Sequence, residues 1–168
     1  MRTSFKDICY TFFGIFYVVF FMIFVAFVDG MLNGNILIWY VIMAAWGTDI
    51  FAFFVGKAIG KHKFSKVSPK KSVEGCIGGV IGAVALILIY TYIVNTFWNM
   101  EYSYVFMTAI GIILSLIGQI GDFAASSIKR FVDIKDYSNL IPGHGGMLDR
   151  IDSLLFIAPF AYALFSLL

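Results

Sequence analysis

The sequence predicts an all-α integral membrane protein with about five transmembrane helices. Three observations support this fold class: the composition, the apolar segments and the placement of the charges. Of the 168 residues, 61% are hydrophobic and only 13% are charged. A soluble domain of this length needs more polar surface to cover its core. The length fits one folding unit, so we expect a single polytopic catalytic domain over residues 1–168.

Five apolar segments come close to the ~20 residues that a helix needs to cross a bilayer. They are residues 8–28, 36–56, 74–98, 103–126 and 151–168. The first segment follows Arg2 and Lys6, as the apolar part of a signal peptide would. It is too long for one, lacks a small-residue cleavage site and is followed by further spans, so we interpret it as a retained helix.

All twelve Lys and Arg residues lie in the N-terminal tail or in two longer polar segments, 57–73 and 127–150. The short connections 29–35 and 99–102 contain none. With five spans, the tail and both basic segments fall on the same side of the membrane. The positive-inside rule makes that side cytoplasmic, so we expect a cytoplasmic N-terminus and a C-terminus outside.

The third apolar segment begins with two overlapping pairs of glycines four residues apart, Gly75 with Gly79 and Gly78 with Gly82. Such pairs let two helices approach closely. They are typical either of ordinary packing within a membrane bundle or of a dedicated dimer face, and the sequence does not decide between them.

Three acidic residues interrupt the apolar segments: Asp49, Glu74 and Asp122. Ionisable groups at membrane depth are costly, so each is a functional candidate. Glu74 lies near a segment end and could simply reach water. Asp49 lies deeper and could have a structural hydrogen-bonding role.

Asp122 is the strongest of these candidates because of its neighbours along the helix. Ser126, Lys129 and Arg130 fall on the same helical face as Asp122. A lipid-facing stripe would not combine a carboxylate, a hydroxyl and two cations. This face therefore predicts a polar cavity.

Two further carboxylates, Asp149 and Asp152, come after a stretch rich in Gly and Pro and open the last apolar segment. Alone they could cap a helix, but with Asp122 they form a set of three. That set is flanked by the cations Lys129, Arg130, Lys135 and Arg150. Carboxylates hold Mg²⁺ and cations neutralise phosphate oxygens, so the combination suits a divalent metal with a polyphosphate. Binding of anionic lipid headgroups would explain the cations but not the carboxylates.

The other basic segment contains Ser68, Pro69, Lys70 and Lys71. Ser before Pro is typical of a helix start, whose N–H groups and neighbouring lysines would favour an anion. A plain positive-inside loop is the alternative. His144, between glycines, is either a turn-stabilising hydrogen bonder or a phosphate contact.

Four strings in the region 121–152 resemble the signature of the phosphatidate cytidylyltransferase family, also called CDP-diacylglycerol synthases. They are residues 126–130 (SSIKR), 135–136 (KD), 142–146 (PGHGG) and 149–152 (DRID). A second stretch is similar to the family at Trp46, Asp49, Phe53, Gly56, Gly60, Lys61, residues 68–72, Glu74 and Gly75. The resemblance covers about residues 40 to 168.

The resemblance implies a Mg²⁺-dependent membrane enzyme that condenses CTP with phosphatidic acid to give CDP-diacylglycerol and pyrophosphate. The catalytic residues would be Asp122, Ser126, Lys129, Arg130, Asp149 and Asp152. Substrates would contact Asp49, Ser68, Lys70, Lys71, Lys135, His144 and Arg150. Asp122 and Asp149 would hold the Mg²⁺, with Ser126 and Asp152 near a second cation for which K⁺ is a candidate.

The same resemblance implies a homodimer in the cell (inner) membrane, an active site on the cytoplasmic side and no nucleic-acid partner. Bacterial members usually carry additional N-terminal spans, so we expect either a naturally compact form or a truncated gene product. Three alternatives stay open. They are cytidylyl transfer to another lipid phosphate, such as an archaeal-type ether lipid, a transporter or channel, and a non-catalytic lipid-binding protein.

Overall fold

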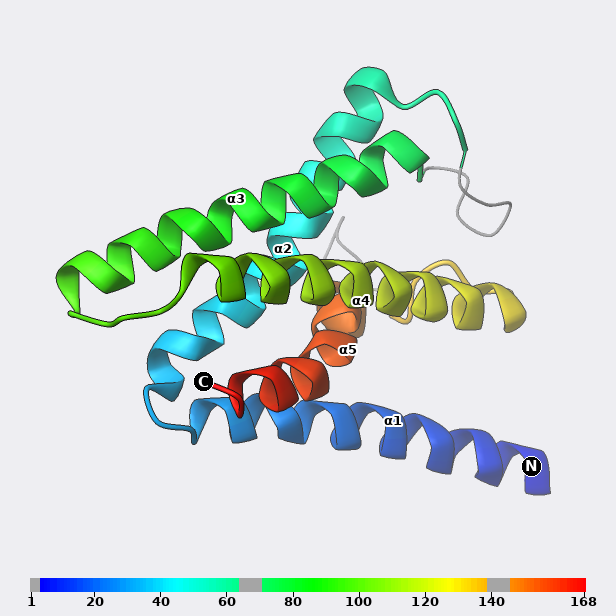
Figure 1. The fold of residues 1–168 in the computed structure, drawn as a ribbon. Coiled ribbons are helices and arrows are strands. Elements are labelled where there is room, and N and C mark those ends of the chain that lie inside the picture. Colours follow the sequence, from blue (N-terminus) through cyan, green and yellow to red (C-terminus); the bar gives the residue numbers. More distant parts are fainter. Residues whose placement is uncertain (1–3, 64–70, 139–145) are drawn as a thin grey trace.

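The computed structural model describes residues 4–63, 71–138 and 146–168, and these form five α-helices (Figure 1). They are α1 (Phe5–Asp29), α2 (Gly34–Ile59), α3 (Val73–Phe97), α4 (Tyr104–Phe131) and α5 (Leu148–Phe165). Each of the five apolar segments coincides with one helix. The described ranges contain no strand beyond a single isolated bridge between Lys63 and Ser72.

Four of these helices, α1 to α4, are long and apolar enough to cross a membrane. The fifth, α5, has 18 residues and carries Asp149, Arg150 and Asp152 in its first turns. The all-helical fold is therefore confirmed, and it is consistent with a membrane protein. The number of spans and their orientation stay predictions.

The end of α4 differs from the prediction, which placed residues 127–150 in a polar connection. The helix continues to Phe131, so Lys129 and Arg130 lie on its last turn. Cations at this end interact favourably with the helix dipole, which gives a physical reason for the extension. The site residues of α4 are consequently held on a regular helix.

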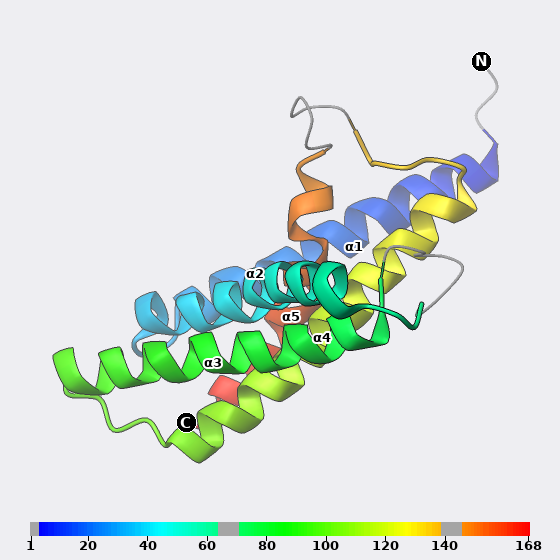
Figure 2. The same ribbon diagram turned by 90° about the horizontal axis from the view of Figure 1, so that it is seen from above.

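The ends of the helices that carry the charged residues lie together (Figures 1 and 2). The C-terminal ends of α2 and α4 face the same way as the N-terminal ends of α1 and α3, and α5 starts beside them. The most extensive interface joins α2 to α3, and α5 packs against both α4 and α1. This arrangement brings the starts of α3 and α5 to one end of α4.

The glycines of α3 create its close contact with α2. A Cβ atom added at Gly75 would lie 2.8 Å from the Ala52 carbonyl oxygen, and one at Gly79 would lie 2.8 Å from that of Thr48. Gly78 faces the side chain of Val55 in the same interface. These glycines therefore serve helix packing within the chain, because only a hydrogen fits against the α2 backbone.

Buried polar side chains cross-link the helices deeper in the bundle. The Tyr40 hydroxyl of α2 donates to Thr91 Oγ1 of α3 at 3.1 Å. The hydroxyls of Thr48 in α2 and Ser115 in α4 lie 2.6 Å apart. Both pairs satisfy groups that would be costly to leave unbonded in an apolar medium.

We predict that Gly75→Ala destabilises the protein by about 1–3 kcal/mol, because the new methyl group must push the α2 backbone away. Gly14→Ala is the matched control, since a Cβ there meets nothing within 4 Å. Thermal unfolding in detergent micelles measures both variants. Equal stability of the two variants would contradict the role assigned to Gly75.

Candidate functional site

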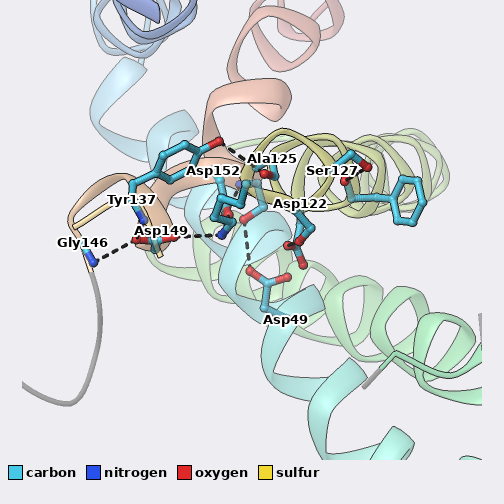
Figure 3. A network of polar contacts seen from close by, with 12 residues as sticks. Asp49, Asp122, Ala125, Ser127, Tyr137, Gly146, Asp149 and Asp152 are labelled. Carbon is cyan, nitrogen blue, oxygen red and sulfur yellow. Dashed lines mark hydrogen bonds and ion pairs between the residues drawn. The ribbon is translucent and has the colours of Figure 1, made fainter. Parts of the chain in front are cut away.

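Three carboxylates from three helices gather at the end of the bundle where the charges lie (Figure 3). Asp49 comes from α2, Asp122 from α4 and Asp152 from α5. Each interacts electrostatically with the other two. The sequence analysis grouped Asp122 and Asp152 with Asp149, whereas the structure adds Asp49 to the set.

Ser153 links Asp49 to α5. Its hydroxyl donates to Asp49 Oδ2 at 3.1 Å, and its backbone N–H donates to Asp152 Oδ1 at 2.9 Å. The Ser153 residue is only 1% exposed, so both bonds are shielded from water. Sequence reasoning missed Ser153, for which the only signal was its place directly after the DRID string.

Lys71 neutralises Asp122. Its ammonium group forms an ion pair with Asp122 Oδ2, while the Ser126 hydroxyl lies 3.4 Å from Asp122 Oδ1. Lys71, at the end of the basic segment before α3, therefore reaches the one acidic residue of α4, as the position of the segment on the same side predicted. Ser68 and Lys70 of that segment lie outside the described residues.

Lys129 neutralises Asp149. Its Nζ donates to Asp149 Oδ1 at 2.8 Å and lies 3.8 Å from Asp152 Oδ2. The side chains of Lys129 and Asp149 are 11% and 5% exposed. This is a largely buried ion pair, which costs much more to break than a surface pair.

The second oxygen of Asp149 organises the chain between α4 and α5. Oδ2 accepts from the backbone N–H groups of Tyr137 and Gly146, both at 2.9 Å. Burial alone would raise the pKa of Asp149, but Lys129 and these two N–H donors outweigh it and lower the pKa. Asp149 is therefore ionised and held on both sides.

Tyr137 is a second residue that sequence reasoning missed. Its hydroxyl donates to the Ala125 carbonyl at 3.3 Å, and its ring centroid lies 5.2 Å from Lys129 Nζ. The ring thus covers the ammonium group as a cation–π partner. An aromatic residue within a polar segment was a weak signal for this role.

Tyr17 brings α1 to the back of the site. Its ring packs against that of Phe156 in α5, with the ring centroids 5.9 Å apart. The Tyr17 hydroxyl lies close enough to Tyr137 and Asp152 for an electrostatic interaction. This hydroxyl is the one buried side-chain polar atom of the described chain that has no hydrogen-bond partner.

Other predicted site residues lie further out. Arg130 is exposed and its guanidinium donates to the Ile134 carbonyl at 3.2 Å, whereas Ser126 and Lys129 contact Asp122 and Asp149. Lys135 and Arg150 are also exposed, and His144 lies outside the described residues.

Glu74 supports the segment that carries Lys71. Its carboxylate accepts from the backbone N–H of Lys61 at 3.2 Å and of His62 at 3.3 Å, and it lies 2.6 Å from His62 Nδ1. The Ser72 hydroxyl caps α3 by accepting from Gly75 N at 3.1 Å. The Glu74 carboxylate is therefore held by groups of the protein and does not simply reach water.

A cavity of about 200 Å³ opens between α2, α3 and α4 beside these charges. Its lining includes Asp49, Phe53, Lys71, Cys76, Gln119 and Asp122. Charged side chains such as Asp122 and apolar side chains such as Phe53 line this same cavity. The cavity could therefore hold a ligand with both an anionic and a flat apolar part.

The donor set suits a hard cation such as Mg²⁺ by its chemistry, because it consists of carboxylate and hydroxyl oxygens. Oδ2 of Asp149 is held by backbone N–H groups, whereas its Oδ1 faces only a lysine. Oδ1 of Asp122 likewise faces Ser126 and its Oδ2 faces Lys71. In the described part of the chain, no three His, Cys, Asp or Glu side chains converge on one metal position. A cation would therefore take the place of a lysine ammonium group.

We predict that Asp149→Asn lowers the free energy of unfolding by about 3 kcal/mol, because it leaves the Lys129 charge without its nearest partner. Asp133→Asn makes the same chemical change at an exposed position, with a φ of 54° that asparagine tolerates. Thermal unfolding of both variants in detergent at neutral pH is the measurement.

The pH dependence gives this prediction a second readout. Because folding lowers the pKa of Asp149, its contribution is complete above the ordinary carboxyl pKa of about 4. That contribution is lost as the pH falls through the lower folded-state pKa. Asp149→Asn should lack this loss of stability at acid pH. If the stability of Asp149→Asn fell with acid pH as that of the wild type does, the assignment would be contradicted.

Comparisons with known proteins show the family to which the sequence belongs. The sequence model of the cytidylyltransferase family matches residues 1–168. The phosphatidate cytidylyltransferase of Bacillus subtilis (strain 168) is 43% identical over 131 residues, which is 77% of this chain and 47% of the relative. That of Thermotoga maritima is 38% identical over 130 residues, which is 76% of this chain and 48% of the relative.

A third relative, the phosphatidate cytidylyltransferase of Staphylococcus aureus (strain COL), is 36% identical over 159 residues. That match takes in 94% of this chain and 59% of the relative. The chain spans about half the length of the curated relatives that it matches. With a family model that matches from end to end, the chain belongs to the cytidylyltransferase family.

Proposed function

We propose that this protein transfers a cytidylyl group from CTP to phosphatidic acid, giving CDP-diacylglycerol and pyrophosphate. The observation that carries the proposal is the group of Asp49, Asp122 and Asp152, with Lys71 and Lys129 as neutralising cations. Such a group suits phosphoryl chemistry, in which a protein mainly positions and neutralises anions. The named relatives are phosphatidate cytidylyltransferases, which supports CTP and phosphatidic acid as the two substrates.

In this reaction an oxygen of the phosphatidate phosphate attacks the α-phosphorus of CTP. The bond from that phosphorus to the bridging oxygen breaks, and pyrophosphate leaves with the electron pair. The attacking oxygen is already anionic near neutral pH, so the mechanism requires no general base. The barrier is the repulsion between two polyanions, which positioned cations reduce.

The lysines supply that neutralisation. Lys71 and Lys129 pair with Asp122 and Asp149 in the structure. Each ammonium group could exchange its carboxylate partner for a phosphate oxygen of the substrate. Tyr137 limits the orientation of Lys129 because its ring lies over the ammonium group. Arg130, Lys135 and Arg150, on the exposed side of the site, would contact the outer phosphates. We assign the same role to Ser68, Lys70 and His144.

We propose that Asp122 and Asp149 would hold the Mg²⁺, and that Ser126 and Asp152 would contact a second cation, for which K⁺ is a candidate. When bound, Mg²⁺ would spread the charge that develops on the nucleotide phosphates. The carboxylate oxygens that would hold it are Oδ2 of Asp122 and Oδ1 of Asp149, which now face lysines.

We further propose five spans in the cell inner membrane, with the N-terminus and the active site on the cytoplasmic side. The placement of all twelve Lys and Arg residues in the tail and the two basic segments supports this orientation. CTP would then arrive from water, and phosphatidic acid would enter laterally from the cytoplasmic leaflet. A homodimer without a nucleic-acid partner is the assembly that we expect.

We predict that Asp122→Asn lowers CTP-dependent formation of CDP-lipid by about 100-fold or more, because several kcal/mol of charge stabilisation are lost. Glu101→Gln, at an exposed position in the connection before α4, is the matched control. Turnover is measured in detergent with Mg²⁺, and products from a mixed lipid pool are identified by mass spectrometry. Removing Mg²⁺ with a chelator should abolish the wild-type activity. Near-normal turnover of Asp122→Asn would contradict the proposal.

The orientation has its own test, in a background where Cys9 and Cys76 are replaced by serine. We predict that Glu101→Cys reacts with a membrane-impermeant maleimide added to intact cells, and that Lys135→Cys reacts only after the membrane is opened. Both positions are exposed in the fold. The opposite labelling pattern would overturn the proposed orientation without affecting the chemistry.

A further inference from the structure

We propose that the cavity between α2, α3 and α4 binds the cytosine ring of the nucleotide and that Gln119 selects cytosine over uracil. This inference rests on the proposed function, because it names the base-binding part of the same site. It assigns a specificity role to a residue that lines the cavity but belongs to none of the sequence strings that pointed to the family.

The orientation of the Gln119 amide is fixed by its partner. Nε2 donates to the carbonyl oxygen of Cys76 at 3.0 Å. A carbonyl oxygen can only accept, so the NH₂ group must face it and Oε1 must point elsewhere. Among the described residues, no group donates to Oε1. Because Gln119 lines the cavity and Oε1 is not a buried atom without a partner, we take Oε1 as the acceptor that a ligand in the cavity would meet.

An open carbonyl acceptor distinguishes the two pyrimidines by their position 4. Cytosine carries an amino group there and can donate to Oε1. Uracil carries a carbonyl oxygen at the same place, so two acceptors would face each other. A site built around one such hydrogen bond discriminates strongly, because the wrong base leaves a polar group unpaired.

The other walls of the cavity suit a flat ring. Phe53 supplies an aromatic face, and base–aromatic stacking is favourable for any base. Ala52 and Gly75, which pack against each other between α2 and α3, add small surfaces to the lining. At about 200 Å³ the cavity exceeds the ~30 Å³ that one water occupies several times over. Stacking would therefore hold the base and Gln119 would identify it.

The position of Gln119 connects this cavity to the phosphate-binding groups. Gln119 lies three residues before Asp122 on α4, a rise of about 4.5 Å along the same helical face. Lys71 and Asp122 line the same cavity as Gln119. A base held at Gln119 would thus leave its phosphates at the cations of the site.

The test compares three nucleotides on the wild-type protein and on Gln119→Leu. They are CTP, UTP and the triphosphate of the pyrimidin-2-one ribonucleoside, which lacks the 4-amino group. For the wild type we expect kcat/KM to fall about 10-fold to 100-fold from CTP to the analogue, and at least as far for UTP. For Gln119→Leu we expect CTP to fall to the level of the analogue, so that the preference is lost.

Two further variants separate selection from general damage. Phe53→Leu should weaken CTP and UTP by the same factor and leave their ratio unchanged, because stacking does not read position 4. Ile120→Leu, at an exposed position next to Gln119 on α4, should behave as wild type. The comparison of CTP with its analogue on wild-type protein remains valid even if Gln119→Leu fails to fold.

Equal use of CTP and the analogue by the wild type would overturn the role of Gln119, as would an unchanged CTP preference in Gln119→Leu. If Gln119→Leu or Phe53→Leu raised only the KM for phosphatidic acid, the cavity would bind the lipid instead of the base. That result would also overturn the proposed role of Gln119. Failure of the wild type to form any CDP-lipid would count against the proposed function itself. These outcomes are therefore distinguishable.

Discussion

The pairing of lysine ammonium groups with carboxylates at one end of the bundle is the interaction on which the site depends. Ionisable groups at the edge of an apolar medium are costly unless each charge has a partner. Lys71 and Lys129 provide those partners for Asp122 and Asp149. Each pair also joins segments that are distant in sequence, so the requirement for charge neutrality holds the start of α3 and the start of α5 against α4.

Close packing of α2 on α3 makes this pairing possible. Lys71 lies two residues before α3, so its reach to Asp122 depends on where α3 begins. That position is set by Ser72, whose hydroxyl lies against glycines: a Cβ added at Gly60 would lie 2.4 Å from Ser72 Oγ, and one at Gly56 would lie 3.1 Å from it. Glycines that carry no functional group therefore control the position of a residue that carries one. This explains why the resemblance to the family includes Gly56, Gly60 and Gly75.

The sequence predicted the helices well because apolar length is a local property, and it predicted local groups such as Asp122 with Ser126 because helical spacing is also local. Asp49 joined the acidic set only through the fold, since its bond to Ser153 spans 104 residues. The orientation of the Gln119 amide likewise depends on a carbonyl of another helix. Arg130 shows the limit of helical spacing, because it follows Ser126 by one turn and yet is exposed and donates to the Ile134 carbonyl.

The two oxygens of Asp149 indicate how one residue can stabilise the fold and still take part in a reaction. Oδ2 accepts both backbone N–H groups, and Oδ1 accepts the lysine. If the Lys129 ammonium group moved to a substrate phosphate, Oδ2 would keep residues 137 and 146 in place. Oδ1 would then be free for a cation, so the carboxylate would retain a charged partner throughout. Asp122 has the same division between Ser126 and Lys71. Under the proposed function, a site built this way would exchange cations without a large movement of its backbone.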